Sequence, residues 1–234
     1  MRSLPNRINE DHEVSGKFYI CSRMTKTLTS LLTVLLFFTS HSCGHRSGPV
    51  AYKGYVVDNN VKQMVDARVS SAKGMVLSSM DFRMYENDSL IADTYATGKS
   101  MNECMTMTSM QGDTITITGW LGMFVGFGYR IELFGDTCIV DHFAHSDAEI
   151  YKLKEKDSLE FGVDVPCKHY TLTLAEKPNF KKGQVMEGVI ELKSEDYFEV
   201  ANGEEKRCHI ELTGYFRTDP VESIDDQLKH TGGK

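Results

Sequence analysis

The sequence has little proline, no long hydrophobic run and fewer basic than acidic residues. Only 5 of its 234 residues are Pro, beside 19 Gly, which argues against collagen-like chains and Pro-rich disordered chains. The 26 Lys and Arg residues face 33 Asp and Glu residues, giving a net charge of -7. Phosphate binding needs a basic face, so this balance disfavours nucleic acid as a partner. The longest apolar stretch, residues 28–38, is far shorter than the roughly 20 residues of a membrane-spanning helix.

This apolar stretch has the length of the core of a signal peptide, about 7–15 residues. Lys26 precedes the stretch, and a short polar segment with Cys43 and Gly44 follows it. Residues 24–44 resemble the signal of a bacterial lipoprotein, in which a Cys after the apolar core is lipidated and becomes the mature N-terminus. The resemblance implies export to the cell envelope, lipidation of Cys43 and membrane attachment through that lipid. Ser40 stands where the family usually has Leu, so secretion with cleavage nearby is the alternative.

The chain divides into four segments on this interpretation. Residues 1–43 are a signal segment. Its first part, residues 1–23, is interpreted as an extension that precedes the true start at Met24; the alternative is that residues 1–23 are a cytoplasmic tail. Residues 44–50 form a tether, residues 51–217 a folded body, and residues 218–234 a flexible polar tail. A charged stretch near residues 145–160 is the one candidate boundary between two lobes of the body. Residues 1–43 carry five basic and three acidic residues, so the remainder has a net charge of -9.

The body alternates apolar and polar residues with a period of two, which is typical of half-buried strands. Gly135-Asp136 and the segment around Asn202-Gly203 have the composition of tight hairpin turns. Only residues 61–68 suggest one or two helical turns. Many short strands at this spacing predict an all-β fold, an antiparallel β-sandwich with little helix, as one body or two small lobes. Strands are expected over residues 52–57, 67–70, 75–78, 82–85, 90–95, 103–110, 113–120, 125–134, 137–143, 149–154, 159–165, 169–174, 185–192, 197–200 and 207–217.

A second, shorter resemblance favours a sandwich. The expected strand within residues 53–58 has Gly54 near its start and Asp58 at its end. After a short loop, the small residue Ala67 precedes Val69. This order is similar to the opening of carboxypeptidase-regulatory-like sandwiches, although residues 59–63 replace their usual Gly-Lys-Pro turn. The similarity covers fewer than 20 residues and implies no chemistry.

Four cysteines lie in the folded body: Cys104, Cys138, Cys167 and Cys208. Export would permit disulfides between them, and four cysteines allow three pairings. Pairing neighbours would join Cys104 to Cys138 and Cys167 to Cys208, each bridge restricting the unfolded chain by about 3–4 kcal/mol. The alternative is four buried thiols, since a free Cys packs as a small hydrophobe.

The most ligand-like cluster is Asp141, His142, His145 and Asp147. Imidazole and carboxylate groups suit Zn²⁺, which takes three or four ligands around one point. On a strand, however, His142 and His145 point to opposite faces. A solvated strand end is therefore the favoured interpretation, and a metal site the alternative.

Two further groups of residues have metal-binding side chains. Cys167 and His169 with Cys208 and His209 have gaps too short for the usual Cys₂His₂ zinc spacing. Methionines gather around Cys104, and thioethers suit Cu(I), but Met is also a common filler of irregular cores. On a strand Met105 and Met107 share one face and Met110 takes the other; the group comprises Met101, Met105, Met107 and Met110.

Residues 119–129 are rich in glycine and aromatic side chains but lack the Lys-Ser/Thr ending of a phosphate loop. If Trp120, Phe124 and Tyr129 are exposed, they form a binding face for a sugar or a protein. If they are buried, they belong to the core, which is the favoured interpretation. Glycines within strands often mark a close approach of the backbone.

No spacing in the sequence supplies a clustered acid, base or nucleophile, so catalysis is not expected. The sequence predicts a non-catalytic lipoprotein of the cell envelope without a cofactor. Its expected role is binding or scaffolding, with an envelope protein or a glycan as partner. The alternative is an envelope protein that binds copper or zinc.

Overall fold

The computed structural model describes residues 50–51, 53–72, 75–97, 101–154, 156–219 and 221–223. These residues all belong to one compact unit, Ser47–Lys234, which includes the charged stretch near residues 145–160. The predicted signal segment with Cys43, the tether up to residue 49 and the tail beyond residue 223 lie outside the described residues. Within the described part, no helix has the length and apolar character needed to cross a membrane.

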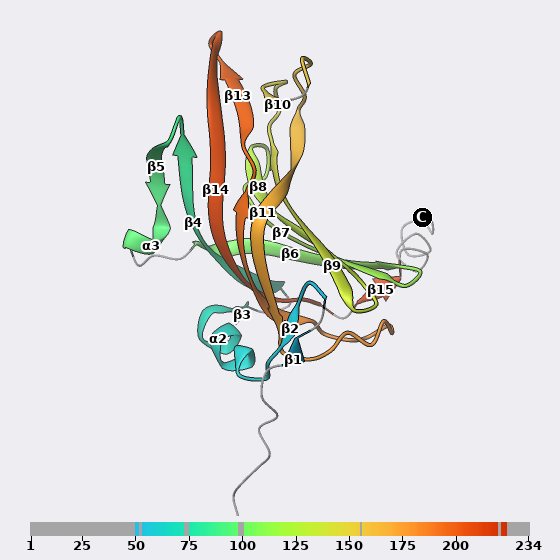
Figure 1. Ribbon diagram of the computed structural model, residues 1–234. Helices are drawn as coiled ribbons and strands as arrows, with labels where there is room; N and C mark the ends of the chain where they lie inside the picture. Colours follow the sequence, from blue (N-terminus) through green and yellow to red (C-terminus); the bar gives the residue numbers. More distant parts are fainter. Residues whose placement is uncertain are drawn as a thin grey trace, which may run out of the picture. The chain divides into compact units, whose positions relative to one another are not determined.

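Strands dominate the described chain, and two short helices accompany them (Figure 1). The helices are α2 (Val61–Arg68) and α3 (Thr94–Thr97). The strands are β1 (Val50–Ala51), β2 (Val56–Val57), β3 (Ser70–Ala72), β4 (Met75–Glu86), β5 (Ser89–Asp93), β6 (Met101–Gln111), β7 (Thr114–Leu121), β8 (Gly126–Phe134), β9 (Thr137–His145), β10 (Tyr151–Leu153), β11 (Gly162–Leu174), β12 (Glu187–Ser194), β13 (Tyr197–Ala201), β14 (Glu204–Arg217) and β15 (Glu222–Ser223).

Eight strands pair in a closed circuit of antiparallel ladders. The order is β4, β6, β7, β8, β9, β11, β12 and β14, and β14 returns to β4. The strand β13 extends this sheet from β14, and β10 pairs with β13. The predicted antiparallel all-β fold is confirmed.

Two strands carry the sheet from one layer into the other. The first part of β11 pairs with β9, and its second part pairs with β12 after an irregularity between Cys167 and His169. In the same way β4 pairs with β6 near Ser78 and with β14 from Ser79 to Glu86. Figure 1 shows β6, β7 and β9 running across the long direction of β4, β14 and β11. Strands that switch layers at bulges are typical of such crossed packing, so the two layers form a single continuous sheet.

The main hydrophobic core lies between these layers. Alternate residues of β7 and β8 point inward, among them Ile117 and Ile131, and neither is exposed to solvent. They pack with Met80, Ile190 and Phe216 from the opposite layer. Burying each such side chain stabilises the fold by about 1.5–3 kcal/mol relative to leaving it exposed. The period of two in the sequence therefore arises because every second residue of these strands faces the core.

The helix α2 covers part of the outer face of the sheet. Its buried residues Val61 and Val65 pack with Val69 against Val189 of β12 and, next to it, Tyr215 of β14. The predicted one or two helical turns over residues 61–68 are thus confirmed. Because the helix continues to Arg68, the strand expected from residue 67 begins only at Ser70, and the opening differs there from a carboxypeptidase-regulatory-like strand.

Other boundaries also differ from the sequence-based expectations. The strands expected over residues 159–165 and 169–174 are one strand, β11, and the strand expected over residues 90–95 ends at Asp93, where α3 follows. The strands expected over residues 75–78 and 82–85 are one strand, β4, because Ser79, Met80 and Asp81 between them continue the ladder with β14. The prediction of a flexible polar tail from Thr218 is wrong for its first residues. Thr218 is 2 % and Val221 1 % exposed, and β15 pairs with β6.

Candidate functional site: an aromatic pocket where β7 meets β8

A cavity of about 300 Å³ lies where β7 ends and β8 begins. We call it the rim pocket. Its apolar wall is made by Met84, Leu121, Val125, Phe127 and Ala144. A second wall is made by Tyr151 of β10 with Tyr197 and Glu199 of β13. The pocket therefore draws on strands that are far apart in the sequence.

The rim pocket lies at the junction of two hydrophobic clusters. The main core includes Phe82, and a smaller cluster contains Ala144, Tyr151 and Tyr197. Phe127 packs against both clusters, and its ring meets that of Phe82 edge-on with centroids 4.9 Å apart. The cavity exists because the side chains of the two clusters do not fill the space between them.

The pairing of β10 with β13 brings the two tyrosines together. In this ladder Tyr151 lies opposite Glu199, and Leu153 lies opposite Tyr197. The centroids of the two tyrosine rings are 6.1 Å apart, with planes inclined by 63°. Burial raises the pKa of Tyr151 to about 12 and raises that of Tyr197 as well. Both phenols therefore stay protonated near neutral pH.

His142 of β9 lies between two residues of the pocket wall. Its ring centroid is 6.4 Å from that of Phe127 and 5.5 Å from that of Tyr197. Nδ1 lies 2.9 Å from the carbonyl oxygen of Gly128, which accepts a hydrogen bond, so Nδ1 carries the proton of the neutral ring. Nε2 is buried and has no hydrogen-bond partner among the described residues. Burial lowers the pKa of His142 to about 4.

Glu199 is the single charged residue among those that line the rim pocket. It lies opposite Lys206 in the ladder of β13 and β14, but the Lys206 ammonium is 2.8 Å from Glu86. Among the described residues, the Lys206 ammonium is thus paired with Glu86 rather than with Glu199. The Glu199 charge also contributes to the raised pKa values of Tyr151 and Tyr197. The pocket wall is therefore electronegative on its β13 side.

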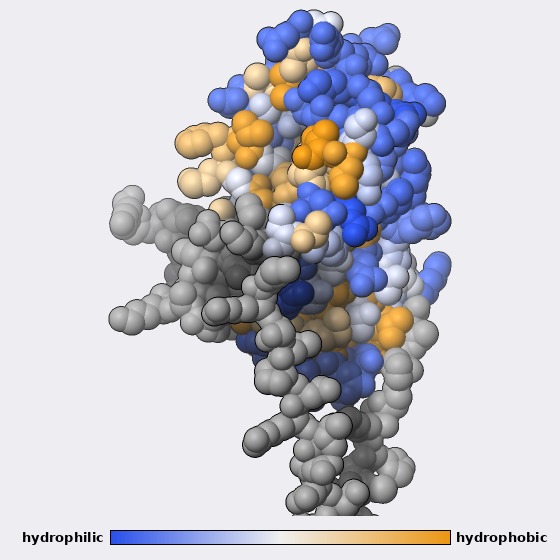
Figure 2. All heavy atoms as spheres, turned by 90° about the vertical axis from the view of Figure 1, so that its left-hand side faces the viewer, coloured by the Kyte–Doolittle hydropathy of each residue, from blue (hydrophilic) through white to orange (hydrophobic). Residues whose placement is uncertain are grey.

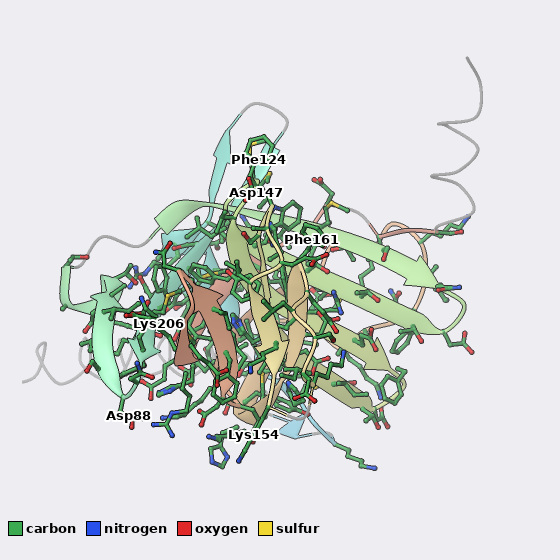
Figure 3. The ribbon with its side chains drawn as sticks, turned by 90° about the horizontal axis from the view of Figure 1, so that it is seen from above. Asp88, Phe124, Asp147, Lys154, Phe161 and Lys206 are labelled. Atoms are coloured by element: carbon green, nitrogen blue, oxygen red, sulfur yellow. The ribbon has the colours of Figure 1, made fainter. Side chains whose placement is uncertain are left out.

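Exposed apolar side chains stand beside the pocket. The loop between β7 and β8 carries Met123, Phe124 and Val125, which are 78 %, 76 % and 57 % exposed. Gly122 begins this loop with a φ of +94°, and a Cβ there would meet the backbone of Val125. Figure 3 shows Phe124 and Phe161 near Asp147, and Gly126 and Gly162 both pair with His145 in the sheet.

The favoured interpretation of residues 119–129 as core holds for Tyr129, and the alternative of one exposed binding face formed by Trp120, Phe124 and Tyr129 is wrong. Tyr129 is fully buried in the main core, where its ring occupies the space beside Gly119. Trp120 is half-buried, and only Phe124 is strongly exposed. The close approach expected at the glycines is found, since a Cβ on Gly119 would overlap the Tyr129 ring.

The predicted ligand cluster on β9 is divided between two faces. His142 points inward and is fully buried, whereas His145 is half-buried and lies 3.4 Å from the backbone oxygen of Met123. Asp141 is half-buried and Asp147 is exposed in the loop after β9. In the described part of the chain, no three His, Cys, Asp or Glu side chains come together as a metal site would need.

The other two metal sets are also separated. Cys208 is buried in the smaller cluster, whereas His209 stacks on Tyr85 with ring centroids 4.5 Å apart. Met107 is 61 % exposed, and Met110 packs against the main core. Met105 shares the face of Met107, as the strand period predicts, and Met101 is described by its backbone alone.

The four cysteines of the described residues are free thiols. Cys104, Cys138 and Cys208 are buried, and Cys167 is half-buried at the bend of β11. Burial raises the pKa of Cys104, Cys167 and Cys208 to about 12 in each case. Burial also raises the pKa of the Cys138 thiol, so all four stay protonated near neutral pH and are expected to react slowly.

A second hollow of about 330 Å³ runs over the outer face of β11, β12 and β14. Two of the charges along it are paired with each other, since Lys193 lies 2.8 Å from Glu211, and Tyr95 shares a hydrogen bond with Thr213. Figure 2 shows hydrophobic residues at the surface in the upper half of the side that carries β5 in Figure 1. In β5 itself, Leu90 and Ile91 are half exposed. The rim pocket is the better candidate site because its wall is mostly apolar with few polar groups.

Tyr151, Tyr197 and Glu199 were not identified by the sequence analysis. They lie on short strands, and nothing in the local sequence indicates that β10 pairs with β13. The signal that was available is the apolar loop Met123-Phe124-Val125 inside a glycine-rich segment. No protein-family model, no curated protein and no solved structure matches the chain.

Proposed function

We propose that this chain is a non-catalytic binding module of the cell envelope whose rim pocket holds a small, largely apolar ligand. The observation that carries the proposal is a mostly apolar cavity, between two hydrophobic clusters, with a lip of three exposed apolar residues. Ligand pockets are typically concave and apolar with a few polar groups, and exposed apolar side chains gathered in one place commonly mark a contact site.

The protonation states beside the pocket support binding rather than catalysis. General acid–base catalysis works best with a pKa near the operating pH. The pKa of Tyr151 is raised to about 12 and that of His142 is lowered to about 4, both chiefly by burial. Neither group therefore changes its protonation state near neutral pH.

The envelope location rests on the resemblance of residues 24–44 to a lipoprotein signal. On this proposal Cys43 carries the lipid, and the folded body presents its pocket outside the cytoplasm. Expression in a bacterium fed a clickable fatty acid tests this part: the native chain takes up the label and Cys43→Ala does not. Equal labelling of both chains, or of neither, would overturn the lipid anchor.

Binding is tested by titrating the protein with the neutral dye Nile red and following its fluorescence. Val125→Arg places a charge in the pocket wall at a residue that is already half exposed, so the fold is kept while dye affinity falls by about tenfold. Ile139→Arg is the matched control, since Ile139 is 46 % exposed on β9 and does not line the pocket. Dye binding that is absent, or equally affected by both variants, contradicts the proposal.

A further inference from the structure

The rim pocket has the components that recognise an organic cation. Three aromatic rings line it: Phe127, Tyr151 and Tyr197. The faces of aromatic rings carry partial negative charge, and each ring attracts a desolvated cation by about 0.5–2 kcal/mol. Aromatic pockets of this kind are a recurring way to hold ammonium groups.

The charges around the pocket favour the same sign of ligand. Of the described residues that line it, only Glu199 is charged, and the neighbouring Lys206 ammonium is paired with Glu86, which leaves the negative charge of Glu199 without an ion pair among them. Lys152 on β10 is 2.5 Å from Glu205 and is therefore already paired. His142, behind Phe127 and Tyr197, is neutral near pH 7, so it adds no positive charge.

The exposed lip supplies the apolar part of the site. Val125 both lines the pocket and is 57 % exposed, and it continues into Phe124 and Met123. An alkyl chain that leaves the pocket at this point would cover apolar surface now open to water, at about 25 cal/mol for each Å² covered.

We infer that the rim pocket binds a small alkylammonium ligand, with the charged nitrogen among Phe127, Tyr151 and Tyr197 beside Glu199, and the chain along the lip Met123–Val125. This inference rests on the proposed function and names its ligand class. An alkanoate of the same length is disfavoured because its carboxylate would face Glu199. A neutral alcohol keeps the apolar contacts but lacks both the attraction to the rings and the attraction to Glu199.

Calorimetric titration of the full chain with hexylammonium, hexanol and hexanoate at pH 7 tests the ligand class. Hexylammonium is expected to bind about tenfold more tightly than hexanol, and hexanoate more weakly than either. If hexanol and the dye bind but hexylammonium has no advantage, the inference fails and the proposed function stands. If none of the three ligands binds, both fail.

Glu199→Gln separates charge from shape. This variant is expected to reduce hexylammonium affinity about tenfold and leave hexanol affinity unchanged. Glu205→Gln is the matched control, because Glu205 lies next to β13 but pairs with Lys152 instead of lining the pocket. Lys206→Gln is expected to strengthen hexylammonium binding severalfold. Equal effects of Glu199→Gln and Glu205→Gln on hexylammonium overturn the role of Glu199.

The rings are tested with two substitutions at one position. Tyr151→Phe keeps the aromatic face and is expected to retain hexylammonium binding, whereas Tyr151→Leu is expected to lose at least fivefold. The thermal midpoint of each variant reports whether the fold is kept. A Tyr151→Leu protein that folds and binds hexylammonium as the native chain does would overturn the inference.

Discussion

His142 Nδ1 lies 2.9 Å from the carbonyl oxygen of Gly128 on the neighbouring strand β8. This hydrogen bond fixes the tautomer, since the carbonyl can only accept and Nδ1 must donate. Nε2 is left as a buried acceptor without a partner among the described residues. The imidazole is thus held neutral in the wall behind Phe127 and Tyr197.

The first prediction concerns pH. Burial lowers the folded-state pKa of His142 to about 4, whereas an unfolded His has a pKa of about 6.5. Between these values the unfolded chain binds more protons, so stability is complete above about pH 6.5 and is lost as the pH falls toward 4. The loss attributable to this one group is about 3 kcal/mol. Urea unfolding across this pH range measures it.

His142→Gln provides the comparison for that experiment, since an amide can still donate to the Gly128 carbonyl but does not titrate. Its stability is expected to fall less between pH 6.5 and 4 than that of the native chain. Parallel curves for the two proteins would contradict a buried, neutral His142.

A second prediction concerns the ion pair that joins α2 to the sheet. The Arg68 guanidinium lies 3.5 Å from Asp81, whose side chain is only 7 % exposed, and it also lies over the Tyr215 ring. Arg68→Met leaves the Asp81 charge buried without this partner, and a loss of about 1–3 kcal/mol is expected. Lys62→Met is the control, because Lys62 is itself largely exposed in its ion pair with Glu187. The free energy of unfolding is measured by chemical denaturation. Equal losses in the two variants would show that leaving the buried Asp81 carboxylate without Arg68 has no cost in stability.

A third prediction concerns the core beside Gly119. The Tyr129 ring occupies the place that a side chain at residue 119 would take. Gly119→Ala is therefore expected to displace that ring and cost about 2 kcal/mol through overpacking. Gly112→Asn is the matched control: its φ of +57° is one that Asn tolerates, and no atom lies within 4 Å of a Cβ there. In thermal unfolding, the midpoint temperature of Gly119→Ala should lie well below that of Gly112→Asn.

A fourth prediction concerns the thiols. Because the four body cysteines are free and burial raises their pKa values, iodoacetamide should label them only slowly in the folded protein. Unfolding in urea without a reductant should expose all four to rapid labelling, which peptide mass mapping detects. A requirement for reductant would instead show that the disulfides allowed by export have formed.

Local features of the chain were predictable because they depend on neighbouring residues. The alternation along β7, the helix over residues 61–68 and the Asn202-Gly203 turn were each expected. In that turn both residues have positive φ, 55° and 80°, as the hairpin type requires. The separation of His142 from His145 also followed from the strand period.

Features set by long-range pairing were not predictable. The closure of the sheet depends on β14 pairing with β4, and Val221 belongs to the fold because it reaches the core. The rim pocket needs β10 to lie beside β13, so its tyrosines come together only after distant strands have paired. The sequence of residues 119–129 was compatible with an exposed binding face or with the core. The structure places Tyr129 in the core and leaves Phe124 exposed.

The sequence by itself determined the all-β class, the inward and outward faces of the strands and the acidic balance, because alternation and composition are properties of the chain. Which residues form a site was decided only by the tertiary structure. Glu199 lies opposite Tyr151 in the ladder of β13 with β10, and Phe127 joins them from β8. No local pattern encodes that meeting, since it depends on which strands pair and where the two clusters leave space between them.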